Sequence, residues 1–171
     1  MLPAMMRRFF LAAAACAMLG GCGFEPLYGE RRDVNVVGEL AGVRIAPIPD
    51  RGGQVLRNFL LDQIKPRGTG SGAYTLAVEL REPQQEIGIL RNDTATRIAY
   101  SAIATYTLAD AGGRRLLAGQ SSSNTTYQLS NSPFSSLASR FDSRDRALQE
   151  ISVDIRNQLA AYFLDASRKR Q

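Results

Sequence analysis

Residues 94–108 keep a two-residue period in which apolar side chains alternate with mostly polar or small ones. Successive side chains of a β-strand point to opposite faces, so this pattern predicts a long strand with one buried face. Residues 73–82 show the same period over a shorter length. Two half-buried strands need a second layer to cover their apolar face. The inward residues are expected to be Tyr74, Leu76, Val78, Leu80, Ile98, Tyr100, Ala102, Ala104, Tyr106 and Leu108.

A long helix near the C-terminus is predicted to supply that layer. Ser132-Pro133 is typical of a helix start, with serine as the N-cap and proline in the first turn. Apolar residues then recur at spacings of three, four or seven, which predicts one stripe down a helix of about 30 residues. The stripe consists of Leu137, Phe141, Leu148, Ile151, Ile155, Leu159, Tyr162 and Phe163.

The remaining elements complete an α+β order. Residues 42–47 predict a short strand. A helix follows that Asp50 or Gly52 caps and that Pro66 and Gly68 end, with Phe59 among its core residues. Residues 110–113 predict a hairpin turn into a polar strand over 114–127, while 83–93 fit either a flexible rim or a strand extension. The expected fold is a two-layer α+β sandwich, with two helices packed on one face of a four-stranded mixed sheet in the order β-α-β-β-β-α.

The N-terminus has the parts of a bacterial lipoprotein signal peptide. Arg7 and Arg8 precede an apolar run of roughly ten residues, which is too short to span a bilayer. Leu19-Gly20-Gly21-Cys22 then forms a lipobox, so we expect cleavage before Cys22 and acyl and diacylglyceryl lipid on its thiol. Cys16 is a poorer acceptor, because Ala13 stands where a larger aliphatic residue is usual. The alternative interpretations of this N-terminal segment are an ordinary secretory signal and a buried apolar helix.

Together these sequence patterns predict a signal peptide over 1–21, a lipidated tether over 22–41, one domain over 42–167 and a basic tail over 168–171. The 171-residue chain has no histidine and only two cysteines, so imidazole catalysis is excluded and the mature domain has no thiol to spare for a disulfide or a metal. The formal charge of +5 falls to +3 when Arg7 and Arg8 are removed. No basic stripe with interleaved aromatic residues indicates nucleic-acid binding. Catalysis by carboxylates alone stays open, and we expect no cofactor.

Three groups of residues are candidates for a site. Residues 142–146 are a charged run that we expect to be a solvated helix face, with Asp142 and Arg146 paired at i and i+4 and Arg144 exposed. Tyr100 and Tyr106 could form a ligand platform but are more typical of a core. Arg91 and Arg97 flank the Asn92-Asp93 turn and could bind an anion at the rim of the sheet, although most such arginines are simply solvated.

The start of the mature chain, Cys22-Gly23-Phe24-Glu25-Pro26-Leu27-Tyr28-Gly29, resembles the CGFxPLYG start of the alphaproteobacterial LptE family of lipopolysaccharide-assembly lipoproteins. Weaker matches follow in the same order, among them residues 43–51, 56–58 and 74–76, Arg97, Thr126-Tyr127, residues 146–148 and residues 158–163. The resemblance covers nearly the whole mature chain. It implies two helices on a four-stranded sheet, in agreement with the residue patterns.

The resemblance also implies a function that is not catalytic. LptE-like lipoproteins sit as a plug in the outer-membrane barrel LptD, assist its assembly and bind lipopolysaccharide on its way to the outer leaflet. By that likeness the chain is expected at the periplasmic face of the outer membrane, held by its lipid, with Arg91 and Arg97 as candidates for lipid A phosphate. Two alternatives stay open: an envelope scaffold or binding lipoprotein with another partner, and a carboxylate-dependent hydrolase.

Overall fold

The computed structural model describes residues 30–64, 72–89 and 95–169, and the chain divides into two units, residues 1–34 and 35–171. Every element below lies in the second unit, except for the first residues of helix α2 (Glu30–Ala41). Within the described ranges, no helix is long and apolar enough to cross a membrane.

The second unit contains a mixed five-stranded sheet. Its strands are β1 (Val43–Ile45), β2 (Tyr74–Arg81), β3 (Gln84–Ile89), β4 (Ala95–Asp110) and β5 (Arg115–Gln128). The long strand β4 is central: β5 pairs with it along one edge, while β2 and β3 follow each other along the other edge. Only β1 is parallel to its neighbour, β2.

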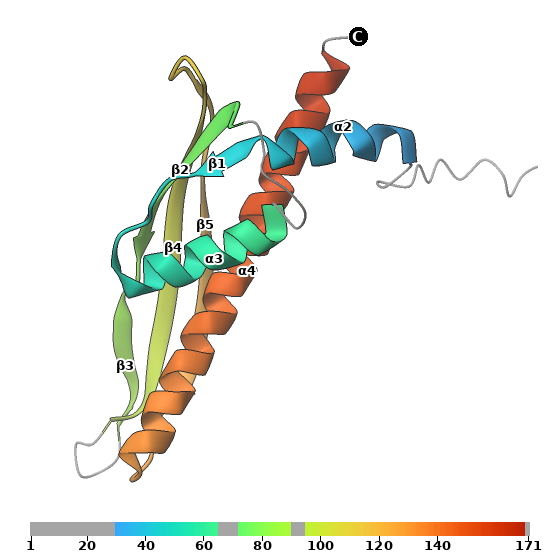
Figure 1. Ribbon diagram of the computed structural model, residues 1–171. Helices are drawn as coiled ribbons and strands as arrows, with labels where there is room; N and C mark the ends of the chain where they lie inside the picture. The colour runs from blue at the N-terminus through green and yellow to red at the C-terminus, as the bar shows by residue number, and fades with distance from the viewer. Residues whose placement is uncertain (1–29, 65–71, 90–94, 170–171) are drawn as a thin grey trace, which may run out of the picture. The chain divides into compact units, whose positions relative to one another are not determined.

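Two helices, α3 (Asp50–Ile64) and α4 (Pro133–Arg168), form the second layer. Helix α4 packs on β4 and β5, and α3 packs on β1, β2 and α4 (Figure 1). Ser132 caps α4 through its side-chain oxygen, which accepts a hydrogen bond from the Ser135 N–H, and Pro133 follows in the first turn as the sequence predicts. The α+β sandwich is therefore confirmed, with five strands in place of the expected four.

The core lies between the two layers. The predicted inward residues of β4 are all buried, and so are Leu76 and Val78 of β2. Helix α3 contributes Leu56, Leu60 and Ile64, whereas Phe59 is only partly buried. From α4 come Leu148, Ile151, Ile155, Leu159 and Phe163, five members of the predicted stripe. At the start of the stripe the prediction is wrong, since Leu137 is 46% exposed.

One segment differs from the sequence-based expectations, and one that the sequence left open is settled. Residues 30–41, expected to belong to the tether, form α2, and Val36 and Leu40 of this helix are buried in the core. These two apolar residues lie four apart, a helical spacing that the Gly, Pro and charged residues before them obscure. Strand β3 settles the open interpretation of residues 83–93 in favour of a strand over 84–89, with register irregularities on both sides of Gly88.

The hairpin between β4 and β5 turns where the sequence predicts. Gly113 has φ 80°, a left-handed conformation that glycine adopts without a steric cost. The Asp110 carboxylate accepts hydrogen bonds from the backbone N–H groups of Gly112 (3.0 Å) and Arg114 (2.9 Å). These bonds, together with the Arg114 guanidinium, lower the pKa of Asp110. The ionised carboxylate therefore stabilises the turn that joins the two longest strands.

Candidate functional site

Of the candidate residues singled out from the sequence, the described structure brings Tyr100 and Arg144 to one cleft, whereas Arg97 and Tyr106 do not line it. Cys22 and Arg91 lie outside the described residues. Arg97 lies near the start of β4, is exposed, and stands in register with Gly88 of β3 and Gln128 of β5. A pairing of Arg91 with Arg97 thus remains a prediction.

The two strand tyrosines belong to the core. Tyr100 is 2% exposed and Tyr106 is 1% exposed. The Tyr106 hydroxyl donates a hydrogen bond to the Gln158 side chain of α4, and burial, together with the nearby charge of Asp154, raises the Tyr106 pKa. Tyr106 thus ties the sheet to the helix, as the core interpretation predicts.

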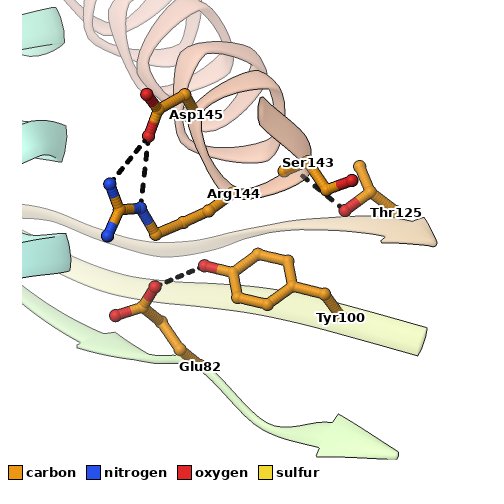
Figure 2. Close-up of polar contacts among 6 residues, drawn as sticks. All are labelled: Glu82, Tyr100, Thr125, Ser143, Arg144 and Asp145. Carbon is orange, nitrogen blue, oxygen red and sulfur yellow. Dashed lines mark hydrogen bonds and ion pairs between the residues drawn. The ribbon is translucent and has the colours of Figure 1, made fainter. Parts of the chain in front are cut away.

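The charged run over 142–146 is only partly the solvated face that the sequence predicts. Asp142 and Arg146 do form the expected ion pair, at 3.0 Å, and both side chains are well exposed. The side chain of Arg144, expected to be exposed, is only 14% exposed, so that prediction is wrong. The reason is the position of Arg144 on α4, on the side that faces α3 and the end of β2. Figure 2 shows its guanidinium directed at Asp145, with hydrogen bonds of 3.0 and 3.2 Å.

Arg144 is one of the residues around a cleft of about 330 Å³ between α3, α4 and the strands. Three arginines reach this cleft: Arg51 from the first turn of α3, and Arg140 and Arg144 from successive turns of α4. The remaining lining residues are Asp50, Gly52, Glu82, Gln84, Tyr100, Leu137 and Phe141. We call this group of residues the arginine cleft.

At the floor of the arginine cleft, the Tyr100 hydroxyl donates a hydrogen bond to the Glu82 carboxylate (Figure 2). Burial of Tyr100, this bond and the negative charge of Glu82 raise the pKa of Tyr100 above its ordinary value of 10.0. The tyrosine therefore stays protonated and keeps donating at any physiological pH. Glu82 is held in place as a hydrogen-bond acceptor.

Two of the guanidinium groups contact the Phe141 ring. The Arg51 guanidinium carbon is 5.5 Å from the ring centroid, and that of Arg144 is 5.1 Å from it. Cation–π contacts use the face of the guanidinium plane and leave the N–H groups at its edge free to bind oxygen atoms. Phe141 thus brings the guanidinium groups of two different helices close to one ring.

Glycines allow α3 to approach Glu82. A Cβ built on Gly52 would collide with the Glu82 carboxylate, and one built on Gly53 would lie 2.6 Å from the Ile48 side chain and 3.0 Å from its backbone. Asp50, at the start of this helix, has φ 63°, a left-handed conformation that aspartate tolerates better than most residues. Glu82 therefore sits at the amino end of α3, where the helix dipole favours a negative charge.

The arginine cleft was not predicted from the sequence, although part of its pattern is visible there. Arg140, Phe141 and Arg144 place two guanidinium groups on one helix face around an aromatic ring, since residues four apart lie on the same side. The contributions of Arg51 and Glu82 come from elements distant in sequence, and no local pattern brings them together.

Chemically, the arginine cleft is suited to binding an anion. Guanidinium groups offer paired N–H donors that match the oxygens of a phosphate or carboxylate. In the ranges that the structure describes, no group of three or more cysteine, aspartate or glutamate side chains is placed to hold a metal ion.

The fold occurs in bacterial lipoproteins of known structure. The crystal structure of a protein assigned as a lipoprotein from Caulobacter crescentus CB15 matches with a TM-score of 0.64 and 24% identity, over 77% of this chain and 97% of that chain. A minor lipoprotein from Acinetobacter baumannii matches with a TM-score of 0.54 and 15% identity, over 71% of this chain and 92% of that one.

A third structure, of uncharacterised lipoprotein B from Nitrosomonas europaea, matches with a TM-score of 0.52 and 11% identity, over 70% of this chain and 82% of that one. At these identities the likeness shows a common fold. No protein-family model matches the chain, and neither does the sequence of any curated protein.

Proposed function

We propose that the chain is the lipoprotein component of an outer-membrane lipopolysaccharide translocon. In this proposal the lipid on Cys22 anchors the domain at the periplasmic face of the outer membrane. The domain plugs and assists the assembly of an LptD-type barrel and binds lipopolysaccharide during its transport to the outer leaflet. It acts by binding, without catalysis.

The observation that carries the proposal is the lipobox cysteine followed directly by Gly23-Phe24-Glu25-Pro26-Leu27-Tyr28-Gly29, which resembles the start of the LptE family. The fold supports it, because two helices on a mixed sheet are what that resemblance implies, and because the structures with the same fold are those of proteins described as lipoproteins.

The sheet face that points away from the helices is suited to contact with a polar, hydrated surface of a partner protein. Its exposed residues on β2, β4 and β5 are mainly polar. The inner wall of an outer-membrane barrel is polar as well, so this face can exchange hydrogen bonds with water for hydrogen bonds with the wall. Among its members are Glu79, Thr105, Gln120, Ser122, Asn124 and Thr126.

Anchoring is tested by Cys22→Ala. With no thiol to acylate, the variant should leave the membrane pellet and appear in the soluble periplasmic fraction, and its mature mass should lack the acyl chains. Retention of the variant in the membrane pellet, together with an unacylated wild-type mass, would contradict the anchor.

Lipopolysaccharide binding is proposed to involve Arg91 and Arg97, because the guanidinium fork matches lipid A phosphate. The double change to alanine should weaken binding, and the loss should be greater at low salt, since exposed charge contacts are screened at high salt. If a folded double variant binds lipopolysaccharide as the wild type does, these two arginines are ordinary solvated residues and the tail over 168–171 is the next candidate. In that tail Lys169 already pairs with Asp165 at 2.7 Å.

The function itself is tested by conditional depletion in the source bacterium. Lipopolysaccharide accessible to a membrane-impermeant label should fall, and restoring the wild-type chain should restore it, whereas restoring Cys22→Ala should not. Unchanged surface lipopolysaccharide after depletion would refute the translocon role and would favour an envelope binding module with another partner.

A further inference from the structure

The arginine cleft has two guanidinium groups without an acidic partner. In the part of the chain that the structure describes, no carboxylate lies within ion-pair distance of Arg51 or Arg140, and both residues are exposed. Arg144, by contrast, is engaged by Asp145 (Figure 2). As far as the described residues go, the N–H donors of Arg51 and Arg140 are therefore left to water or a ligand.

The acids of the arginine cleft balance its three arginines in formal charge, but two of these acids are already engaged. Asp145 pairs with Arg144, and the Glu82 carboxylate accepts a hydrogen bond from the Tyr100 hydroxyl at the amino end of α3, where the helix dipole favours a negative charge. Asp50 is the remaining acid in the lining, and it forms no ion pair with Arg51 or Arg140 in the described part of the chain. The attraction for an anion therefore comes from the two guanidinium groups without an acidic partner, which lie on two different helices.

Exposed apolar side chains continue from the arginine cleft along α4. Leu137 lines it and is 46% exposed, and Phe134, three residues earlier on the same helix face, is 80% exposed. Neither side chain contributes to the core. A free anion has no use for this apolar extension, whereas an anionic lipid places acyl chains directly beside its phosphate.

We propose that the arginine cleft binds the phosphate group of an anionic phospholipid, with Arg51 and Arg140 donating to the phosphate oxygens and with Leu137 and Phe134 lying against the acyl chains. This goes beyond the proposed translocon role and stands whether or not a barrel binds the domain. Free phosphate offers the same anionic oxygens to the two arginines. It has no acyl chains, so contact with Leu137 and Phe134 distinguishes the phospholipid from it.

The test is calorimetric titration of the full chain, purified in a non-ionic maltoside detergent. The probes are dihexanoyl phosphatidic acid, dihexanoyl phosphatidylcholine and inorganic phosphate. Phosphatidic acid should bind most tightly, because it combines the anion with acyl chains and lacks the positive choline group. Its affinity should fall as salt is raised.

Two sets of variants assign the binding to the arginine cleft. Arg51→Ala/Arg140→Ala should weaken phosphatidic acid binding by about tenfold or more, the scale expected for lost charge-assisted hydrogen bonds. A matched control, Arg146→Ala/Arg156→Ala, removes two arginines of α4 outside the cleft and should leave the affinity unchanged. Phe134→Ser should weaken phosphatidic acid binding and leave binding of inorganic phosphate as it was.

Three results would overturn the proposal: no phosphatidic acid binding, equal losses in the cleft and control variants, or unchanged affinity in a folded cleft variant. Inorganic phosphate binding as tightly as the lipid, with no effect of Phe134→Ser, would identify a free-phosphate site and refute the lipid assignment. Folding is checked by the thermal midpoint. Should the double variant unfold, Arg140→Gln replaces it, because Arg140 is exposed and can be changed without opening the core.

Discussion

Truncation of Ile155 tests the packing of α4 on the sheet. Ile155 lies near the middle of the helix and is 0% exposed. Its neighbours on the same stripe, Ile151 and Leu159, are 1% and 0% exposed. The change Ile155→Ala therefore removes side-chain carbons from a fully covered position, without touching a charge or a hydrogen bond.

The expected cost follows from the atoms lost. Ile155→Ala deletes three carbons, worth about 2.4 kcal/mol of transfer free energy at about 0.8 kcal/mol each. The cavity left behind adds to this, because a helix packed against strands relaxes only partially, and the total should be about 3 to 4 kcal/mol.

The assay is urea unfolding followed by circular dichroism, on the mature chain carrying Cys22→Ala so that no lipid is attached. With an m-value of about 2 kcal/mol per molar, the midpoint should fall by about 1.5 to 2 M. Arg146→Ala is the control on the same helix, since its ion pair with Asp142 is exposed, and it should cost well under about 1 kcal/mol. Equal midpoint shifts in the two variants would show that α4 presents a different face to the sheet.

Two further predictions concern backbone geometry. Gly53→Ala should lower the urea midpoint, because its Cβ would lie 3.0 Å from the Ile48 backbone. Gly38→Ala in α2, with nothing within 4 Å of the new Cβ, should leave the midpoint unchanged or raise it. Equal shifts in the two variants would refute the close approach at Gly53. Asp110→Ala should destabilise the hairpin at neutral pH. Because the folded pKa of Asp110 is lowered, the folded state binds fewer protons than the unfolded state at acidic pH, around and between the two pKa values. The stabilisation from Asp110 is therefore fully present above about pH 4 and is lost as the pH falls through the lowered pKa. Urea midpoints at several pH values should show the difference between wild type and Asp110→Ala shrinking in acid, and a difference that is constant with pH would contradict the role of the charge.

Much of the fold could be predicted because its signals are local. The two-residue period of residues 94–108 specifies both the length of β4 and its buried face, and the Ser132-Pro133 start together with the apolar spacing defines α4. Burial of Tyr100 and Tyr106 follows from the same period. Strand β3 was harder, because Gly88 breaks the alternation and the register shifts on both sides of it.

The arginine cleft could not be predicted because it depends on contacts between distant segments. Residues 142–146 look like one solvated run, yet Arg144 turns inward where Phe141 and the amino end of α3 meet, while Arg146, two positions on, points into solvent. The approach of Glu82 to Gly52 likewise joins the end of β2 to the start of α3. Helix α2 was missed because its apolar spacing is short: among its side chains that the structure describes, Val36 and Leu40 are the buried apolar ones.

The most direct test of the proposed translocon role is purification of the affinity-tagged full chain from detergent-solubilised outer membranes of the source bacterium, with the attached proteins identified by mass spectrometry. We expect a large β-barrel protein of the LptD type to co-purify in near-stoichiometric amount. Recovery of the chain from the inner membrane, or from the outer membrane without any large barrel, would contradict it.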